Sequence, residues 1–121
     1  MDNLAIADSV LNSIKKLNGV SEKDTSFDVD FIIHINNALL SLHQVGLGDE
    51  SGVYIEDSTT TWLELAGDPM LARSLGTYVY VKVRLVFDPP ASPTIVEALK
   101  SSADESLSRI LYLLELRRLN N

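Results

Sequence analysis

The stretch from Leu75 to Pro90, LGTYVYVKVRLVFDPP, constrains the fold most, because it is the longest run of large apolar and β-branched residues in the chain. With a period of two, residues 77–87 divide into two faces, which is typical of a strand. With helical spacing, Leu71, Leu75 and Val79 begin a single apolar stripe. Periodicity alone therefore leaves helix and strand both open.

Length favours a helix for this element. Between Pro69 and Asp88 the only breaker is Gly76, and a helix tolerates one glycine at about 1 kcal/mol. A continuous element of about twenty residues suits a helix, because most strands have roughly 5–6 residues. Asp68 can cap such a helix with Pro69 in its first turn, and Asp88-Pro89-Pro90 ends it.

Apolar spacing predicts three further helices, over residues 4–18, from about 26–28 to 45, and over 94–119. Trp62 opens a single helical turn at 62–65. Between these elements lies a loop rich in glycine and acidic residues, in which residues 53–55 are a short strand candidate, either half of a hairpin or an edge.

Composition narrows the class of protein. The chain has 121 residues, which predicts one domain spanning 1–121. No run of eighteen apolar residues is present, so we expect no transmembrane helix. Cysteine is absent, which excludes disulfides and thiolate zinc sites. The first ten residues carry acids where a signal peptide carries Lys or Arg, so nothing indicates export.

The formal net charge of −7 argues against a protein that grips nucleic acid, since that requires neutralising phosphates. Six acids lie between residues 49 and 68 with no Lys or Arg among them: Asp49, Glu50, Glu56, Asp57, Glu64 and Asp68. Patterned charge of this kind serves assembly in many small proteins. A merely solvated acidic loop is the alternative interpretation.

The sequence predicts no catalytic, cofactor-binding or metal-binding residue. His34 and His43 are nine positions apart and fall on different helix faces. Asp30 and His34 stand four apart, but one such pair falls short of a metal site. No nucleophile elbow occurs, and Gly46-Leu47-Gly48 is too short for a phosphate loop.

The final helix is longer than a bundle of this size requires, and its leucines are more than one buried stripe can use. The predicted buried stripe consists of Ile95, Leu99, Ala103, Leu107, Ile110, Leu111 and Leu114. Leu113 and Leu116 lie off that stripe, and Leu119 extends past the expected body. We therefore expect residues 111–121 to dock on a partner.

The order of these segments resembles the phage head–tail connector family, the small head-completion or adaptor proteins of long-tailed phages and prophages. The resemblance covers about residues 8–116. It is carried by LNSIKKLNGV (11–20), FDVDFIIHINNALLSLHQVGLG (27–48), a single Trp62 in an acidic segment, TYVYVKVRLVFDPP (77–90) and the leucine-rich closing helix. The pattern DxDxxxHIN at 28–36 is among its most specific parts.

The resemblance implies a mainly all-α fold: a small bundle of about four helices with a short β-hairpin or extended loop near 47–58 and a long C-terminal helix. It makes residues 69–87 a helix. It also implies a structural virion protein rather than an enzyme, with no membrane role, at the head–tail interface after assembly in the host cytoplasm. Such proteins form a ring, expected to have twelve subunits, that binds the portal and the stopper or tail-completion protein while double-stranded DNA passes through without sequence readout.

Two surfaces are then expected to make these contacts. The first, facing a neighbouring subunit or the ring lumen, consists of Asp49, Glu50, Tyr54, Ile55, Glu56 and Asp57. The second, docking on the portal, consists of Leu111, Leu113, Leu114, Leu116, Arg117, Arg118 and Leu119. Deleting residues 48–56, or truncating after Ile110, should leave the fold but abolish assembly or portal attachment. The alternative is a non-viral regulatory or accessory helical interaction domain.

Overall fold

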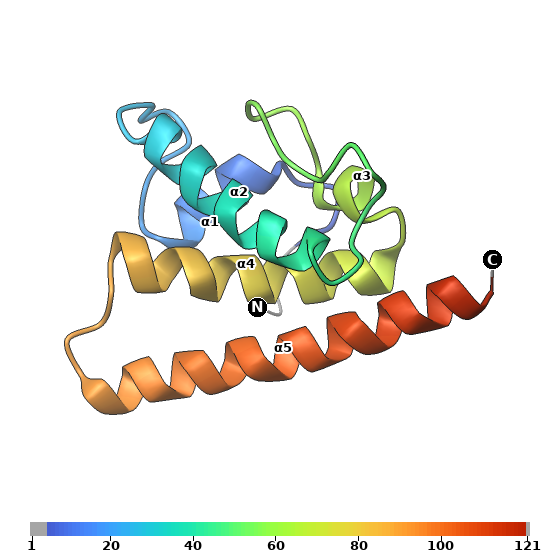
Figure 1. Ribbon diagram of the computed structural model, residues 1–121. Helices are drawn as coiled ribbons and strands as arrows, with labels where there is room; N and C mark the ends of the chain where they lie inside the picture. Colours follow the sequence, from blue (N-terminus) through green and yellow to red (C-terminus); the bar gives the residue numbers. More distant parts are fainter. Residues whose placement is uncertain (1–4, 121) are drawn as a thin grey trace.

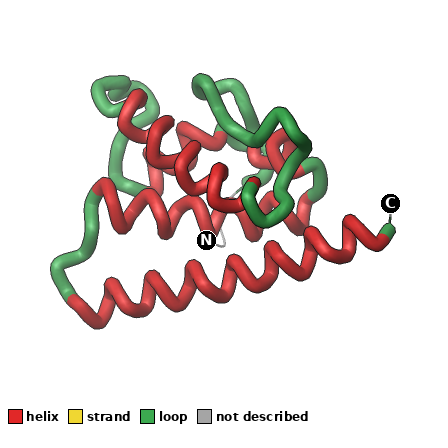
Figure 2. The backbone as a smooth tube through the Cα atoms, in the orientation of Figure 1, coloured by secondary structure: helices red, strands yellow, loops and turns green. Residues whose placement is uncertain are grey.

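The computed structural model describes residues 5–120, which contain five helices (Figure 1). They are α1 (Val10–Leu17), α2 (Asp28–His43), α3 (Trp62–Ala66), α4 (Pro69–Phe87) and α5 (Pro93–Leu119). Within the described residues there is no strand, only an isolated antiparallel bridge between Ser9 and Thr61. The all-α prediction is confirmed, and the strand candidate at 53–55 is wrong: these residues belong to an extended loop (Figure 2).

Helix α4 is the centre of the molecule, with α5 on one side and α1, α2 and α3 on the other (Figure 1). It is the helix that packs against all four others. α5 runs antiparallel to α4 along its length after the short connection at residues 88–92 (Figure 1). The remaining helices form a layer over the opposite side, so the core lies between that layer and α4.

Caps at both ends define α4 as the sequence predicts. The Asp68 side chain accepts a hydrogen bond from the Leu71 N–H at 3.0 Å, and Pro69 occupies the first turn. Its eight buried residues are Leu71, Ala72, Leu75, Gly76, Tyr78, Val79, Val81 and Val83. At 100° per residue they cover most of the helix circumference, because helices pack against both sides. The helix prediction for residues 69–87 is confirmed.

Helix α1 begins later than predicted. Ser9 Oγ accepts a hydrogen bond from the Asn12 N–H at 3.1 Å and caps the helix. The helix predicted from residue 4 is wrong over residues 5–9, and residue 4 lies outside the described part. The reason is a competing pairing: the Leu63 N–H donates to the Ile6 carbonyl at 2.9 Å, and the Val10 N–H donates to the Thr60 carbonyl at the same distance.

The single turn at α3 is confirmed and joins this pairing to the core. Thr61 and Glu64 form a reciprocal capping box at its start. Trp62 is fully buried, and its Nε1 donates to Ser13 Oγ of α1 at 2.8 Å. One indole therefore fixes α3 to α1 across 49 positions of sequence.

Helices α2 and α5 differ from expectation in which residues they bury. On α2, Val45 lies just past the helix and is 46% exposed, although the predicted helix included it. On α5, Ile95 is 52% and Leu111 41% exposed, although both were expected in the stripe. The buried residues of α5 are instead Ala103, Ser106 and Ile110.

Candidate functional site

The loop between α2 and α3 is held against α2 by the side chain of Asn36. Its Nδ2 donates to the Ile55 carbonyl at 2.9 Å, and its Oδ1 accepts the Ile55 N–H at 2.8 Å. Nearer the helix end, His43 Nδ1 hydrogen-bonds the Leu47 carbonyl at 2.8 Å. Leu47 and Ile55 are buried in the core. The expectation that Ile55 is exposed is wrong, because these bonds hold its backbone against α2.

We expect Asn36→Ala to loosen this loop and to lower the free energy of unfolding by about 1–3 kcal/mol, because the Ile55 N–H and carbonyl lose their partners. Amide exchange at Ile55 should accelerate more than exchange at Leu75 in α4. Asn37→Ala, at the exposed neighbouring position, is the matched control and should change neither quantity. Unchanged exchange at Ile55 in the Asn36 variant would mean that core packing alone holds the loop.

The outer part of this loop, residues 48–57, is called the acidic loop below. Asp49 accepts hydrogen bonds from the Ser51 hydroxyl and N–H, and Asp57 from the Thr59 hydroxyl and N–H. These bonds hold the pKa of both carboxyl groups below its ordinary value. Glu50, Tyr54 and Glu56 are also exposed. The acidic loop therefore presents four carboxylates and one tyrosine to solvent.

Near the C-terminus of α5, Arg117 binds the junction between α3 and α4. Its Nη2 lies 2.7 Å from Asp68 Oδ2 and donates to the Ala66 carbonyl at 2.9 Å. Gly67, between these two partners, has a φ of +85° and ends α3 in the left-handed conformation. The hydrogen bond from the Leu71 N–H lowers the pKa of Asp68 most, and the hydrogen bond and positive charge of Arg117 lower it further. Arg117 is thus an internal clamp.

The structure divides the C-terminal residues expected to dock on a partner into two groups. The first group faces the rest of the protein: Leu113 and Leu114 pack against the core cluster, and Arg117 binds Ala66 and Asp68. The expectation that Leu113 lies off the packed stripe is wrong, because the last turns of α5 still pack beside the N-terminal end of α4. The residues that stay exposed are Leu111, Leu116, Arg118 and Leu119. Asn121 lies outside the described residues.

Tyr112 joins the exposed group, although it was not among the docking residues predicted from the sequence. Tyr112, Leu116 and Leu119 are 64%, 39% and 66% exposed, and their i, i+4, i+7 spacing places them on one helix face. We call this face the outer stripe of α5. The spacing was visible in the sequence, but only the direction of packing on α4 shows that it points to solvent. Arg118 lies about 100° around the helix from Leu119 and pairs with Glu115 at 2.6 Å.

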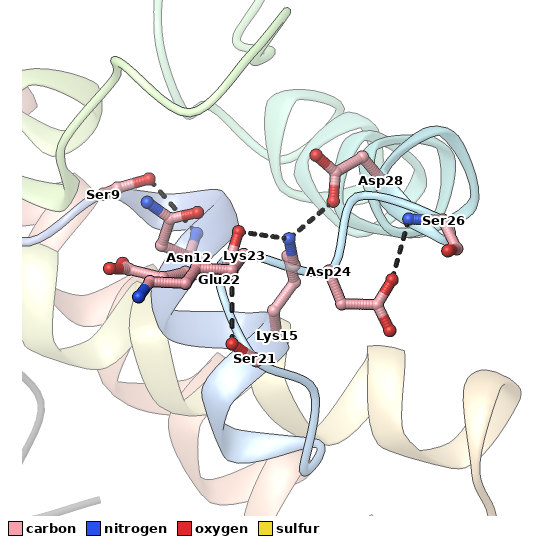
Figure 3. A network of polar contacts seen from close by, with 9 residues as sticks. All are labelled: Ser9, Asn12, Lys15, Ser21, Glu22, Lys23, Asp24, Ser26 and Asp28. Atoms are coloured by element: carbon pink, nitrogen blue, oxygen red, sulfur yellow. Dashed lines mark hydrogen bonds and ion pairs between the residues drawn. The ribbon is translucent and has the colours of Figure 1, made fainter.

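A second internal clamp involves Lys15 of α1, which is fully buried. Figure 3 shows the polar contacts around it. Its Nζ lies 2.7 Å from Asp28 Oδ1 at the start of α2 and 3.2 Å from the Glu22 carbonyl. The same close-up shows Asp24 accepting the Ser26 N–H at 3.0 Å within the connecting loop. These contacts fix the α1–α2 connection, so Lys15 has a structural role.

Within the described residues, no group of three or more His, Asp or Glu side chains is placed to hold a metal ion. His43 is engaged by the Leu47 carbonyl, and His34 lies between α2 and α4 in a groove considered below. No helix in the part of the chain that the structure describes is long and apolar enough to cross a membrane.

These features define a small helical protein whose distinctive surfaces, the acidic loop and the outer stripe of α5, suit contacts with other proteins. The chain belongs to the phage connector protein family, whose model matches residues 10–114. This match confirms the resemblance inferred from the sequence. It indicates a structural role in the connector of a phage particle rather than an enzymatic one. Searches of curated proteins and of solved structures each returned no significant match.

Proposed function

We propose that this protein is one subunit of a ring, twelve copies in the virion, that binds beneath the portal of a DNA-filled phage head. In this proposal the ring completes the head and offers a docking surface to the stopper or tail-completion protein. Double-stranded DNA passes through the ring without sequence readout. The net charge of −7 supports that role, since a negative lining does not hold phosphates.

The observation that carries the proposal is the outer stripe of α5, formed by Tyr112, Leu116 and Leu119. A monomer gains nothing by exposing three large apolar side chains on one helix face, whereas a partner surface would bury them. Because Arg117 clamps this end of α5 to Asp68, the stripe is presented on a fixed element. Family membership favours the virion role over a non-viral accessory domain.

The test is attachment to portal-bearing, DNA-filled heads that lack this protein. Leu116→Glu and Leu119→Glu should weaken attachment at least ~10-fold, because each places an unpaired charge in a desolvated contact. Ile95→Glu is the matched control: it also replaces an exposed aliphatic side chain of this helix with Glu, at a residue 52% exposed near the other end. Cosedimentation with heads, together with nuclease protection of their DNA, measures the result.

Native attachment of both Glu variants would assign the portal contact to another surface. Truncation after Ile110 is a poorer test than the sequence suggests, because it also removes the core contacts of Leu113 and Leu114 and the Arg117 clamp. Deletion of residues 48–56 is confounded in the same way, because it removes the buried Ile55. Single exposed substitutions separate docking from folding.

A further inference from the structure

An open groove of about 370 Å³ lies between α2 and α4. Its lining residues are His34, Asn37, Ala38, Ser41, Lys82, Leu85 and Val86. Most of the lining surface is apolar, no carboxylate contributes to it, and Lys82 carries its positive charge. The Lys82 ammonium forms no ion pair with any described residue and lies 5.7 Å from the centre of the Tyr78 ring.

The groove and the acidic loop lie on opposite flanks of α2. Asn36 and His43, which bind the loop backbone, share one flank of the helix. His34 and Ser41, which line the groove, lie roughly 160° around the helix from them at 100° per residue. The same copy therefore cannot fill its own groove with its own acidic loop.

The outward face between these two flanks carries an apolar stripe beside the exposed polar residues Asn37 and Gln44. Val29, Ile33 and Leu40 are 70%, 51% and 53% exposed there, and their spacing places them in one stripe. The opposite side of α2 buries Phe31, Ile35 and Leu39 in the core. Apolar stripes on both sides of a helix are typical of a helix that other structure covers on both sides. The outward face of α2 is therefore suited to a protein contact.

Charge identifies the occupant. The acidic loop has no Lys or Arg, and Tyr54, 56% exposed, is its large apolar side chain in solvent. Aromatic residues of this kind anchor interfaces when they enter a groove. We propose that the acidic loop of one copy docks in the α2–α4 groove of the next copy, with Tyr54 in the groove and Lys82 facing Glu50 or Glu56. This inference rests on the proposed ring.

The arrangement gives every copy a loop to donate and a groove to fill. A contact between two different surfaces of the same molecule is heterologous, and repetition generates a closed ring when the rotation per copy closes. It also brings Val29, Ile33 and Leu40 next to the contact, because they lie between its two halves on α2.

Disulfide trapping tests this contact directly, because the natural chain has no cysteine. Tyr54→Cys combined with Ser41→Cys should give, on mild oxidation, a ladder of covalent oligomers up to the ring, whereas each single variant should stop at a dimer. Tyr54→Cys combined with Ser108→Cys, on the exposed outer side of α5, is the matched control and should give no ladder beyond a dimer. Absence of the ladder, or an equal ladder from the control pair, overturns the inference.

Charge reversal supplies an independent readout in full-length protein. Lys82→Glu should weaken self-association roughly tenfold, and Glu50→Lys with Glu56→Lys in the same chain should restore much of it. Asp49 and Asp57 are left unchanged because their hydrogen bonds shape the loop. Lys23→Glu, at an exposed position of the α1–α2 loop, makes the same charge change elsewhere and should have no effect. No recovery in the combined variant contradicts the pairing.

The wild-type protein separates this inference from the proposed function. If native mass measurement or electron microscopy of heads shows rings while the cysteine pair forms no ladder, the ring stands and the groove is not its interface. If wild-type protein forms no oligomer, either alone at high concentration or on portal-bearing heads, both the ring and the groove contact are wrong.

Discussion

Replacing Trp62 with alanine should lower the free energy of unfolding by about 3–5 kcal/mol, the range for truncating a fully buried large aromatic side chain. Trp62 is 0% exposed and contributes the largest fully buried side chain. Its loss leaves a cavity where α3 meets the core and removes the bond from Nε1 to Ser13 Oγ. Chemical denaturation measures this change, which corresponds to a fall in Tm of roughly 10–20 °C.

Two variants show that burial, not aromatic character, is the cause. Trp62→Phe keeps much of the ring and loses the hydrogen bond, so its effect should be clearly smaller than that of alanine. Tyr54→Ala removes an exposed ring and should change stability by no more than about 0.5 kcal/mol. A loss below about 1 kcal/mol for Trp62→Ala would contradict the central place of this side chain.

Replacing Lys15 with alanine should be the next most damaging change, at about 2–3 kcal/mol. The substitution removes a fully buried aliphatic stem together with the ion pair to Asp28 and the bond to the Glu22 carbonyl. The effect falls below that of breaking a wholly buried pair, because the Asp28 side chain is 27% exposed and water can reach it. Thermal and chemical unfolding of the purified variant measure it.

The neighbouring Lys16 supplies the control, because it occupies the same last turn of α1 but is exposed. Lys16→Ala should stay within about 0.5 kcal/mol of wild type. Lys15→Met keeps a buried aliphatic side chain without the charge, so it should recover part of the stability that Lys15→Ala loses. The part recovered measures packing, and the remainder measures the ion pair. Equal stabilities for the two alanine variants would show that the Lys15 clamp contributes nothing.

Several parts of the fold follow from local chemistry and were predictable for that reason. Asp68 before Pro69, Ser92 before Pro93 and Thr61 before Glu64 are cap signals in the sequence, and each side chain accepts the expected backbone N–H. Caps act within four residues of the helix start, so no tertiary information is needed to locate these boundaries. The start of α1 was predicted wrongly, because the backbone of its expected first turn forms hydrogen bonds with residues distant in sequence.

The candidate surfaces were only half predictable. The acidic loop was identified from composition, but the burial of Ile55 depends on Asn36, 19 positions away. The leucine surplus of α5 was also evident, yet the sequence assigned Leu113 to the exposed side and omitted Tyr112. Which face of a long helix reaches solvent depends on the angle at which the helix packs across its neighbour. Helical periodicity in the sequence does not specify that angle.

The sequence by itself determined that the chain forms a small helical bundle with no disulfide, and where most of its helices begin and end. Only the tertiary structure decided why residues 75–87 are helical despite their strand-like composition. α4 lies between α5 and the layer of α1, α2 and α3, so it is buried over most of its circumference. Burial on both sides selects apolar residues at nearly every position, and the free energy of that packing outweighs the modest cost of β-branched residues in a helix.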